Sequence, residues 1–170
     1  SKLQTILIPS NVKTVESYTF KDCKELKSVS LPDELVEVGP EAFLGCINLT
    51  SIKLPESLRE ISRNAFSGCI SLKKIEIFDK VEKIGVDAFK GCSNLTEMII
   101  PEHLYDEVVA ATEECPGSLK IITYNTEYTQ IEGNNRKEYI GEEEYADNLT
   151  LEEFAIPEGV KFIGCYAFRG

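Results

Sequence analysis

The amino-acid sequence predicts an α/β repeat solenoid, built from one supersecondary unit that recurs along 170 residues. Three observations support this fold class. Several residue types recur at one 23-residue spacing, each unit contains an alternating apolar stretch typical of a strand, and a further apolar segment has the spacing of a helical turn. A unit of this size cannot bury its apolar side chains alone, so the units must stack.

The 23-residue period is shared by leucine, phenylalanine and cysteine. The leucines are Leu3, Leu26, Leu49, Leu72 and Leu95, the phenylalanines are Phe20, Phe43, Phe66 and Phe89, and the cysteines are Cys23, Cys46, Cys69, Cys92 and Cys115. The common unit is L-x-x-I-x-L-P-x-x-L-x-x-I-G-x-x-A-F-x-G-C-x-N. Because independent residue types keep one register, we expect equivalent side chains to lie above one another in successive rungs.

Each segment of the unit has its own expected structure. L-x-x-I-x-L alternates inward and outward positions, as in Ile52-Lys53-Leu54, and predicts a parallel strand that the following proline ends. Ile61 then returns the chain to the core on a short irregular arm, and the glycine that follows in other units, such as Gly85, suits a turn. The A-F-x-G-C-x-x-L segment predicts one turn of α- or 3-10 helix.

The register changes in the C-terminal part. Strong helix formers from Tyr105 to Glu114 predict a longer helix in the fifth rung. Phe89 and Tyr145 are two periods plus ten residues apart, which indicates an insertion before the last rungs. The expected organisation is one solenoid with regular rungs at 3–100, a variant helical rung at 101–123, an insertion at about 124–139 and final rungs at 140–170, including a strand near Leu151. We expect it to be part of a longer array.

Composition and charge exclude several function classes. The hydrophobic fraction is 42%, and no apolar run approaches the roughly 20 residues of a membrane span, so we expect no membrane insertion. The net charge of −11 disfavours nucleic acid as a partner. The charge is uneven, since residues 1–100 carry 13 Lys+Arg against 14 Asp+Glu and residues 101–170 carry 5 against 15. The first ten residues lack the pattern of a secretory signal.

The cysteines and the single histidine do not point to chemistry. The five periodic cysteines share one inward position with parallel side chains, which predicts a ladder of buried thiols rather than disulfides. Cys165 is the expected exposed thiol. No C-x-x-C pair occurs, and His103 and the Glu142–Glu144 run are expected to be solvated. We therefore expect no catalytic residue, metal or cofactor.

Two adjacent units carry a family resemblance. Residues 26–49 (LKSVSLPDELVEVGPEAFLGCINL) and 49–72 (LTSIKLPESLREISRNAFSGCISL) resemble the BspA-like, bacterial surface-antigen type of leucine-rich repeat, and the resemblance extends over roughly 3–123 and 140–170. It implies a right-handed arc with the parallel sheet on the concave face and the short helical or 3-10 turns on the convex face. It also implies a cell-surface or secreted protein that acts in adhesion or binds a host or extracellular-matrix protein.

The side chains of L-x-x-I-x-L that leave the core form the predicted partner-binding surface on the concave face. They are Lys27, Ser28, Ser30, Thr50, Ser51, Lys53, Lys73, Lys74, Glu76, Thr96 and Glu97. Hydroxyls and lysines predominate, and no aromatic anchor is present. Such a surface suits an acidic or polar protein segment, although it is equally typical of a solvated sheet face, because binding hot spots favour Trp, Tyr and Arg.

Three functions are consistent with this sequence. The first is a non-catalytic protein-binding or adhesion module, and the second is a structural spacer that holds other domains away from a cell surface. The third is a hydrolase with a site in the insertion, using Glu132, His103 or Glu142–Glu144; the missing nucleophile motif argues against it. Uncapped ends of the stack would also allow self-association through open strand edges.

Overall fold

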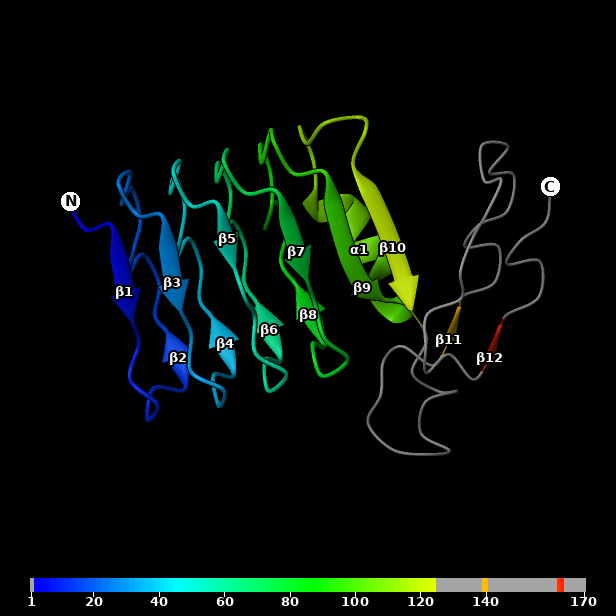
Figure 1. The fold of residues 1–170 in the computed structure, drawn as a ribbon, viewed down its shortest axis with the longest axis horizontal. Helices are drawn as coiled ribbons and strands as arrows, with labels where there is room; N and C mark the ends of the chain where they lie inside the picture. The colour runs from blue at the N-terminus through cyan, green and yellow to red at the C-terminus, as the bar shows by residue number, and fades with distance from the viewer. Residues whose placement is uncertain (1, 125–138, 141–161, 164–170) are drawn as a thin grey trace. The chain divides into compact units, whose positions relative to one another are not determined.

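The computed structural model describes residues 2–124, 139–140 and 162–163 (Figure 1). The chain forms two compact units, residues 1–121 and 122–170, and each is described by itself. The first unit is a stack of rungs that follow the 23-residue period. We number these rungs one to five from Leu3, Leu26, Leu49, Leu72 and Leu95.

The first side of the stack is a parallel sheet made from the L-x-x-I-x-L segments. Its strands are β1 (Thr5–Leu7), β3 (Ser28–Ser30), β5 (Ser51–Ile52), β7 (Lys74–Glu76), β9 (Glu97–Pro101) and β10 (Lys120–Tyr124). Hydrogen bonds join them in the orders β1-β3-β5 and β10-β9-β7, and β5 also contacts β7. Thr5 lies opposite Ser28, and Ser28 opposite Ser51, so the pairing is parallel with a register of one repeat. The predicted parallel strands of the L-x-x-I-x-L segments are therefore confirmed. The further strand expected near Leu151 lies outside the described residues.

A second parallel sheet replaces the irregular arm that the sequence predicts. Its four strands are β2 (Thr14–Val15), β4 (Glu37–Val38), β6 (Glu60–Ile61) and β8 (Lys83–Ile84), in the order β2-β4-β6-β8. Each strand has only two residues, which is too short for alternation to predict it. The strands are instead stabilised by the stacking of rungs. One residue of each strand is buried, and these residues lie in one register: Val15, Val38, Ile61 and Ile84.

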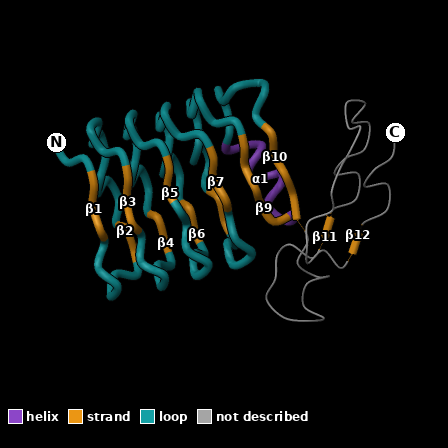
Figure 2. The backbone as a smooth tube through the Cα atoms, in the orientation of Figure 1, coloured by secondary structure: helices purple, strands orange, loops and turns teal. Residues whose placement is uncertain are grey.

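The third side of the stack contains the A-F-x-G-C segments, which in rungs one to four form tight turns and no continuous helix, so the predicted helical turn is found only in part (Figure 2). Within a rung, Cys46 N donates to Phe43 O at 3.1 Å, as in a 3-10 turn. Between rungs, Phe43 N donates to Ala65 O at 2.8 Å, and Phe66 N to Ala88 O at 2.7 Å. The amides therefore bond to the neighbouring rung, and this prevents them from continuing a helix.

Helix occurs only in rung five among the described residues. A 3-10 turn η1 (Glu102–Leu104) leads into α1 (Tyr105–Ala111), which confirms the longer helix predicted there and ends it three residues before Glu114. Leu104, Val108 and Ala111 are buried, and α1 contacts β8. The helix thus packs its apolar face against rung four.

Glycine has two different roles in the repeat. Gly45, Gly68 and Gly91 in F-x-G-C have φ of 71°, 69° and 67°, a left-handed conformation that glycine adopts without steric cost. Gly85 has no such conformation. A Cβ there would lie 2.3 Å from the backbone N of Arg63, so this glycine is needed for the close approach of two rungs and not for a turn.

The core runs continuously through the first unit. Phe20, Phe43, Phe66 and Phe89 stack with ring centroids 5.1, 5.2 and 5.5 Å apart and interplanar angles of 15°, 2° and 5°. Leucines and isoleucines from both sheets surround this stack, and most of them are fully buried. Repeated identical contacts therefore hold each rung to the next.

Beyond the end of β10, the second unit is described at two short strands, β11 (Tyr139–Ile140) and β12 (Phe162–Ile163). They pair in parallel, with Tyr139 opposite Phe162 and Ile140 opposite Ile163. This is again a register of 23 residues, as expected from the final rungs. The insertion at about 124–139 lies mostly outside the described residues, and the division of the chain that the sequence suggests remains a prediction.

Candidate interaction surface

The first sheet presents one row of outward side chains per strand. Ser28 and Ser30 on β3 are exposed on either side of buried Val29, and the same alternation places Lys74 outward beside buried Ile75 on β7. Of the eleven predicted surface residues, nine are exposed, and Glu76 and Glu97 are half-buried. The parallel register stacks these side chains in columns one repeat apart, so the structure brings the predicted residues together on one face.

Some of these side chains are engaged within the sheet. Thr50 Oγ1 donates to the carbonyl of Lys27 at 3.4 Å, and Thr96 Oγ1 donates to the carbonyl of Lys73 at 3.2 Å. These two hydroxyls link adjacent rungs. The exposed serines of the predicted surface are Ser28, Ser30 and Ser51, and they lie along the same strands.

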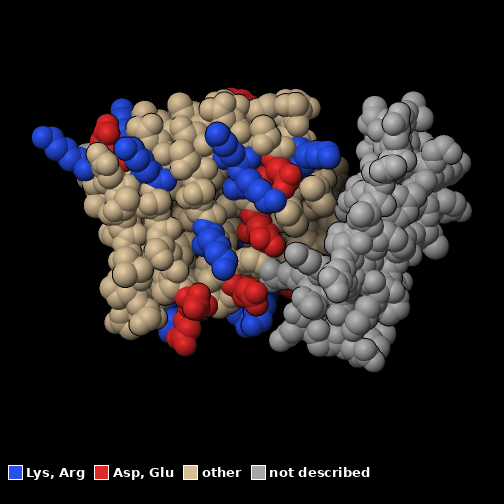
Figure 3. Space-filling model, viewed as in Figure 1, with Lys and Arg blue, Asp and Glu red and all other residues tan. Residues whose placement is uncertain are grey.

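Positive charge predominates on this surface. Lys74 forms an ion pair with Glu97, and Lys27 Nζ donates to the neutral amide oxygen of Gln4 at 3.5 Å. Lys53 and Lys73 are exposed and have no ion-pair partner among the described residues. Figure 3 shows blue side chains spread over the strands of the first sheet, with red ones between them.

One lysine of this surface was not among the eleven predicted residues. Lys120 is exposed at the start of β10, and its backbone N donates to Thr96 O at 3.0 Å. It continues the column of Lys74 and Glu97, and the repeat spacing of 23 residues from Glu97 is the signal that identifies it. We call the surface with Lys27, Lys53, Lys73, Lys74 and Lys120 the lysine face. Its five lysines face two glutamates, Glu76 and Glu97, within a chain of net charge −11.

Charged side chains on the second sheet differ from those of the lysine face, because they form ion pairs between neighbouring rungs. Lys83 Nζ lies 2.9 Å from Glu60 Oε1, and Arg59 bonds Glu82. The hydrogen bond from Lys83 lowers the pKa of Glu60, and the same bond raises the pKa of Lys83. The two charges of each pair neutralise one another, whereas Lys53 and Lys73 of the lysine face have no ion-pair partner in the described part of the chain.

The cysteine ladder lies on the core side of the third face. Cys46 Sγ donates to Phe20 O at 3.1 Å, and Cys69 Sγ to Phe43 O at 3.2 Å. Burial raises the pKa of Cys46 to about 12 and also raises the pKa of Cys69. The predicted burial is confirmed for Cys23, Cys46, Cys69 and Cys92, all free thiols, whereas Cys115 is free and half-buried. A buried thiol of this kind is a packing group and not a nucleophile.

The described residues contain no candidate metal site. No group of three or more His, Cys, Asp or Glu residues in this part of the chain is placed to hold a metal ion. His103 Nε2 lies 3.1 Å from the carbonyl of Val81, and its side chain is exposed at a corner of rung five. Glu132 and Glu142–Glu144, which the hydrolase hypothesis uses, and Cys165 lie outside the described residues.

The repeating rungs with parallel sheets define a β-solenoid of the leucine-rich-repeat class. The chain matches the family described as BspA type leucine rich repeat region, in six copies over residues 1–115 and 121–170, and it belongs to this family. Comparison with curated proteins gave no match. Among the described residues, no helix has the length and hydropathy to span a membrane.

Three solved structures are similar to this chain. A leucine rich cell surface protein from Faecalibacterium prausnitzii is 30% identical with a TM-score of 0.61, over 77% of this chain and 35% of that one. The pneumococcal vaccine antigen PcpA is 28% identical with a TM-score of 0.61, over 95% and 36% of the two chains. The leucine rich repeat protein TpLRR of T. pallidum is 27% identical with a TM-score of 0.56, over 96% and 74%. This chain thus spans about a third of the first two proteins.

Proposed function

We propose that this chain is a non-catalytic protein-binding module and that the lysine face is its binding surface. The observation that carries the proposal is the excess of lysine over glutamate on one regular sheet face of an acidic chain. Acidic protein segments are the partners that this charge attracts, because complementary potentials raise the association rate and suppress wrong partners. The rigid columns of serine and lysine supply hydrogen-bond donors at the strand spacing.

We further propose that the module acts on a cell-surface or secreted protein in adhesion, with a host or extracellular-matrix protein as partner. Membership of the BspA type family and the name of the Faecalibacterium cell surface protein support this location. The curvature that would make the lysine face concave is part of this proposal. The alternative is a structural spacer, which is supported by the lack of an aromatic anchor on the face.

The test compares two double charge reversals in the 170-residue chain. Lys53→Glu with Lys73→Glu alters exposed, unpaired lysines of the lysine face, and Lys24→Glu with Lys80→Glu alters exposed lysines in turns outside the sheet. The probe is a fluorescent glutamate-rich peptide, and its affinity is measured by anisotropy at low and high salt. We expect the first variant to bind about tenfold more weakly at low salt, with little difference at high salt.

The control variant distinguishes a site from general charge. Both variants change the net charge equally, so an equal loss of affinity in the two would contradict a defined binding face. If neither variant weakens the binding, the spacer becomes the better explanation. Circular dichroism of each variant checks that the fold is retained, as expected for substitutions of solvent-exposed side chains.

A further inference from the structure

A second surface of the first unit exposes apolar side chains at rungs four and five. Val86 is 70% exposed, Tyr105 is 47% exposed and Val109 is 50% exposed. Tyr105 and Val109 are four residues apart in α1 and therefore lie on one side of the helix. Val86 occupies in rung four the repeat position that Val109 occupies in rung five.

The helix is held against the rung that carries Val86. Phe89 N donates to Ala111 O at 3.0 Å, and α1 contacts β8, so rungs four and five are adjacent at this point. Val108 and Ala111 on the inner side of α1 are fully buried. Tyr105 and Val109 are thus left on the outer part of a helix whose core contacts are already complete. We call Val86, Tyr105 and Val109 the helix patch.

The fold itself does not require apolar residues at these positions, as the other rungs show. The position of Val86 and Val109 is held by Ser17, Pro40 and Arg63 in rungs one to three. The position of Tyr105 is held by Lys13, Val36, Arg59 and Glu82 in the earlier rungs. Polar or charged residues hold most of these positions, with Val36 and Pro40 as the exceptions, so the core of the repeat does not depend on the apolar residues of the helix patch.

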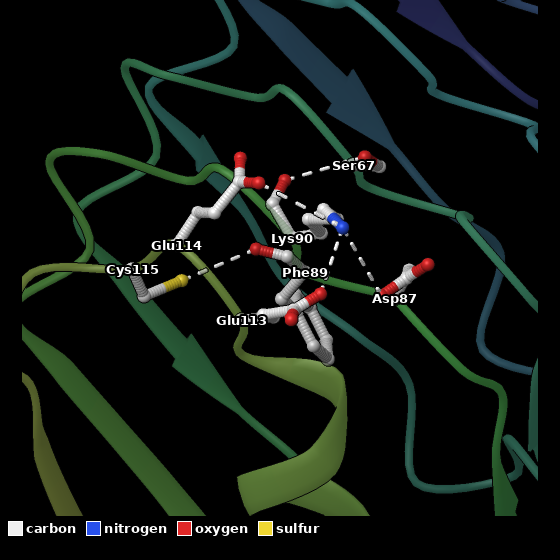
Figure 4. A network of polar contacts seen from close by, with 7 residues as sticks. All are labelled: Ser67, Asp87, Phe89, Lys90, Glu113, Glu114 and Cys115. Atoms are coloured by element: carbon white, nitrogen blue, oxygen red, sulfur yellow. Dashed lines mark hydrogen bonds and ion pairs between the residues drawn. The ribbon is translucent and has the colours of Figure 1, made fainter.

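Acidic side chains accompany the helix patch. Residues 101–115 contain five carboxylates and no Lys or Arg: Glu102, Asp106, Glu107, Glu113 and Glu114. The nearest lysine in the network of Figure 4 is Lys90, whose Nζ lies 2.7 Å from Glu113, 3.7 Å from Glu114 and 3.9 Å from Asp87. One lysine therefore faces three carboxylates, and residues 101–115, which include α1, carry five negative charges and no positive one apart from His103.

We propose that the helix patch is a docking site for a cationic amphipathic segment of a partner protein. Apolar side chains of the partner would pack on Tyr105, Val109 and Val86, and its Lys or Arg residues would face the carboxylates around them. Charge disfavours residues 122–170 as the occupant, because they carry 4 Lys+Arg against 10 Asp+Glu and are repelled by an acidic surface. A second copy carries the lysine face as well as this acidic surface, and the measurement of association state below tests it as the other occupant. The proposal is independent of the lysine face.

The experiment uses the 170-residue chain and a fluorescent peptide of about 18 residues with leucine and lysine on opposite helical faces. Peptides with the same composition in scrambled order, and with glutamate in place of lysine, are the reference probes. Tyr105→Ser with Val109→Ser removes the apolar contacts of α1, and Leu7→Ser with Ile70→Ser is the matched control at exposed apolar residues on other rungs. Of the three peptides, we expect only the amphipathic cationic one to show saturable binding. Its affinity should be about tenfold lower for Tyr105→Ser with Val109→Ser and unchanged for Leu7→Ser with Ile70→Ser.

A charge variant and a measurement of association state complete the test. Asp106→Asn with Glu107→Gln is expected to weaken binding and to reduce its salt dependence, while circular dichroism shows that the fold is retained. Equal loss in the apolar variant and its matched control would overturn the proposal, as would equal binding of the scrambled or glutamate peptide. Concentration-dependent dimerisation that Tyr105→Ser with Val109→Ser abolishes would also overturn it, since a second copy would then cover the helix patch.

Discussion

The phenylalanine stack allows the contribution of ring contacts between rungs to be measured separately from burial. Phe66 is fully buried between two rings, at 5.2 Å from Phe43 and 5.5 Å from Phe89. Phe89 is equally buried but has one ring neighbour, because Thr112 holds the corresponding position in rung five. Replacing each by leucine preserves apolar character and removes two ring pairs at Phe66 but one at Phe89.

The expected magnitudes follow from these contacts. A leucine substitution in a packed core costs about 1 kcal/mol of unfolding free energy, and each lost aromatic pair adds about 1 kcal/mol. Phe66→Leu should therefore lower the free energy of unfolding by about 3 kcal/mol and Phe89→Leu by about 2 kcal/mol. With a urea m value of about 2 kcal/mol/M, the two variants should differ in midpoint by about 0.5 M.

Equilibrium urea unfolding, followed by circular dichroism and by tyrosine fluorescence, measures this difference. Agreement between the two probes is needed because repeat proteins unfold in one step only when neighbouring rungs are strongly coupled. A double-mutant cycle between Phe43 and Phe66 should give a coupling energy of about 1 kcal/mol. Equal midpoints for Phe66→Leu and Phe89→Leu, together with a coupling energy near zero, would refute the argument and leave burial as the whole contribution of the rings.

Two further predictions concern backbone packing and thiol chemistry. Gly85→Ala should reduce the free energy of unfolding by about 1–3 kcal/mol, because the added Cβ would meet backbone atoms of rung three. Gly117→Ala is the control, since a Cβ there has nothing within 4 Å, and it should change the free energy of unfolding by under about 0.5 kcal/mol in the same urea assay. Among the described cysteines, half-buried Cys115 should react with iodoacetamide before Cys46, whose pKa of about 12 keeps it a thiol, as mass spectrometry would show. Equal unfolding midpoints for the glycine variants, or faster labelling of Cys46, would contradict these arguments.

The sequence predicts the first sheet well because its pattern is both local and periodic. Val29, Ile52 and Ile75 alternate with outward polar residues, so their direction follows from the strand pleat, and the period gives their register. The second sheet has the same periodicity but only two residues per strand. Its pairing depends on contacts one repeat away, such as Glu37 opposite Glu60, and a search within one unit cannot detect them.

The helical prediction for the A-F segments is met only in part, because single turns such as Cys46 N to Phe43 O form there without a continuous helix. Three-residue spacing of apolar side chains is compatible with a helix or with a series of tight turns. The amide of Phe43 bonds to Ala65 in the next rung, and left-handed residues such as Gly45 bend the chain at each unit. In rung five, α1 forms where the phenylalanine is absent and helix formers follow one another, and here local preference and structure agree.

The eleven residues of the predicted surface are found on one face because inward and outward positions are decided by the strand alone. The strand alternation does not indicate which outward residues bind a partner, because stacking constrains only the residue types of the inward columns. The column of Ser28, Ser51, Lys74, Glu97 and Lys120 varies in size and charge, while the neighbouring inward column of Val29, Ile52, Ile75 and Met98 stays apolar and buried. Substitutions in an outward column therefore change charge and contact chemistry at little cost in stability. We expect partner recognition where outward residues differ from one repeat to the next, at the unpaired lysines of the lysine face and at the helix patch. Lys53→Glu with Lys73→Glu tests the first surface, and Tyr105→Ser with Val109→Ser tests the second.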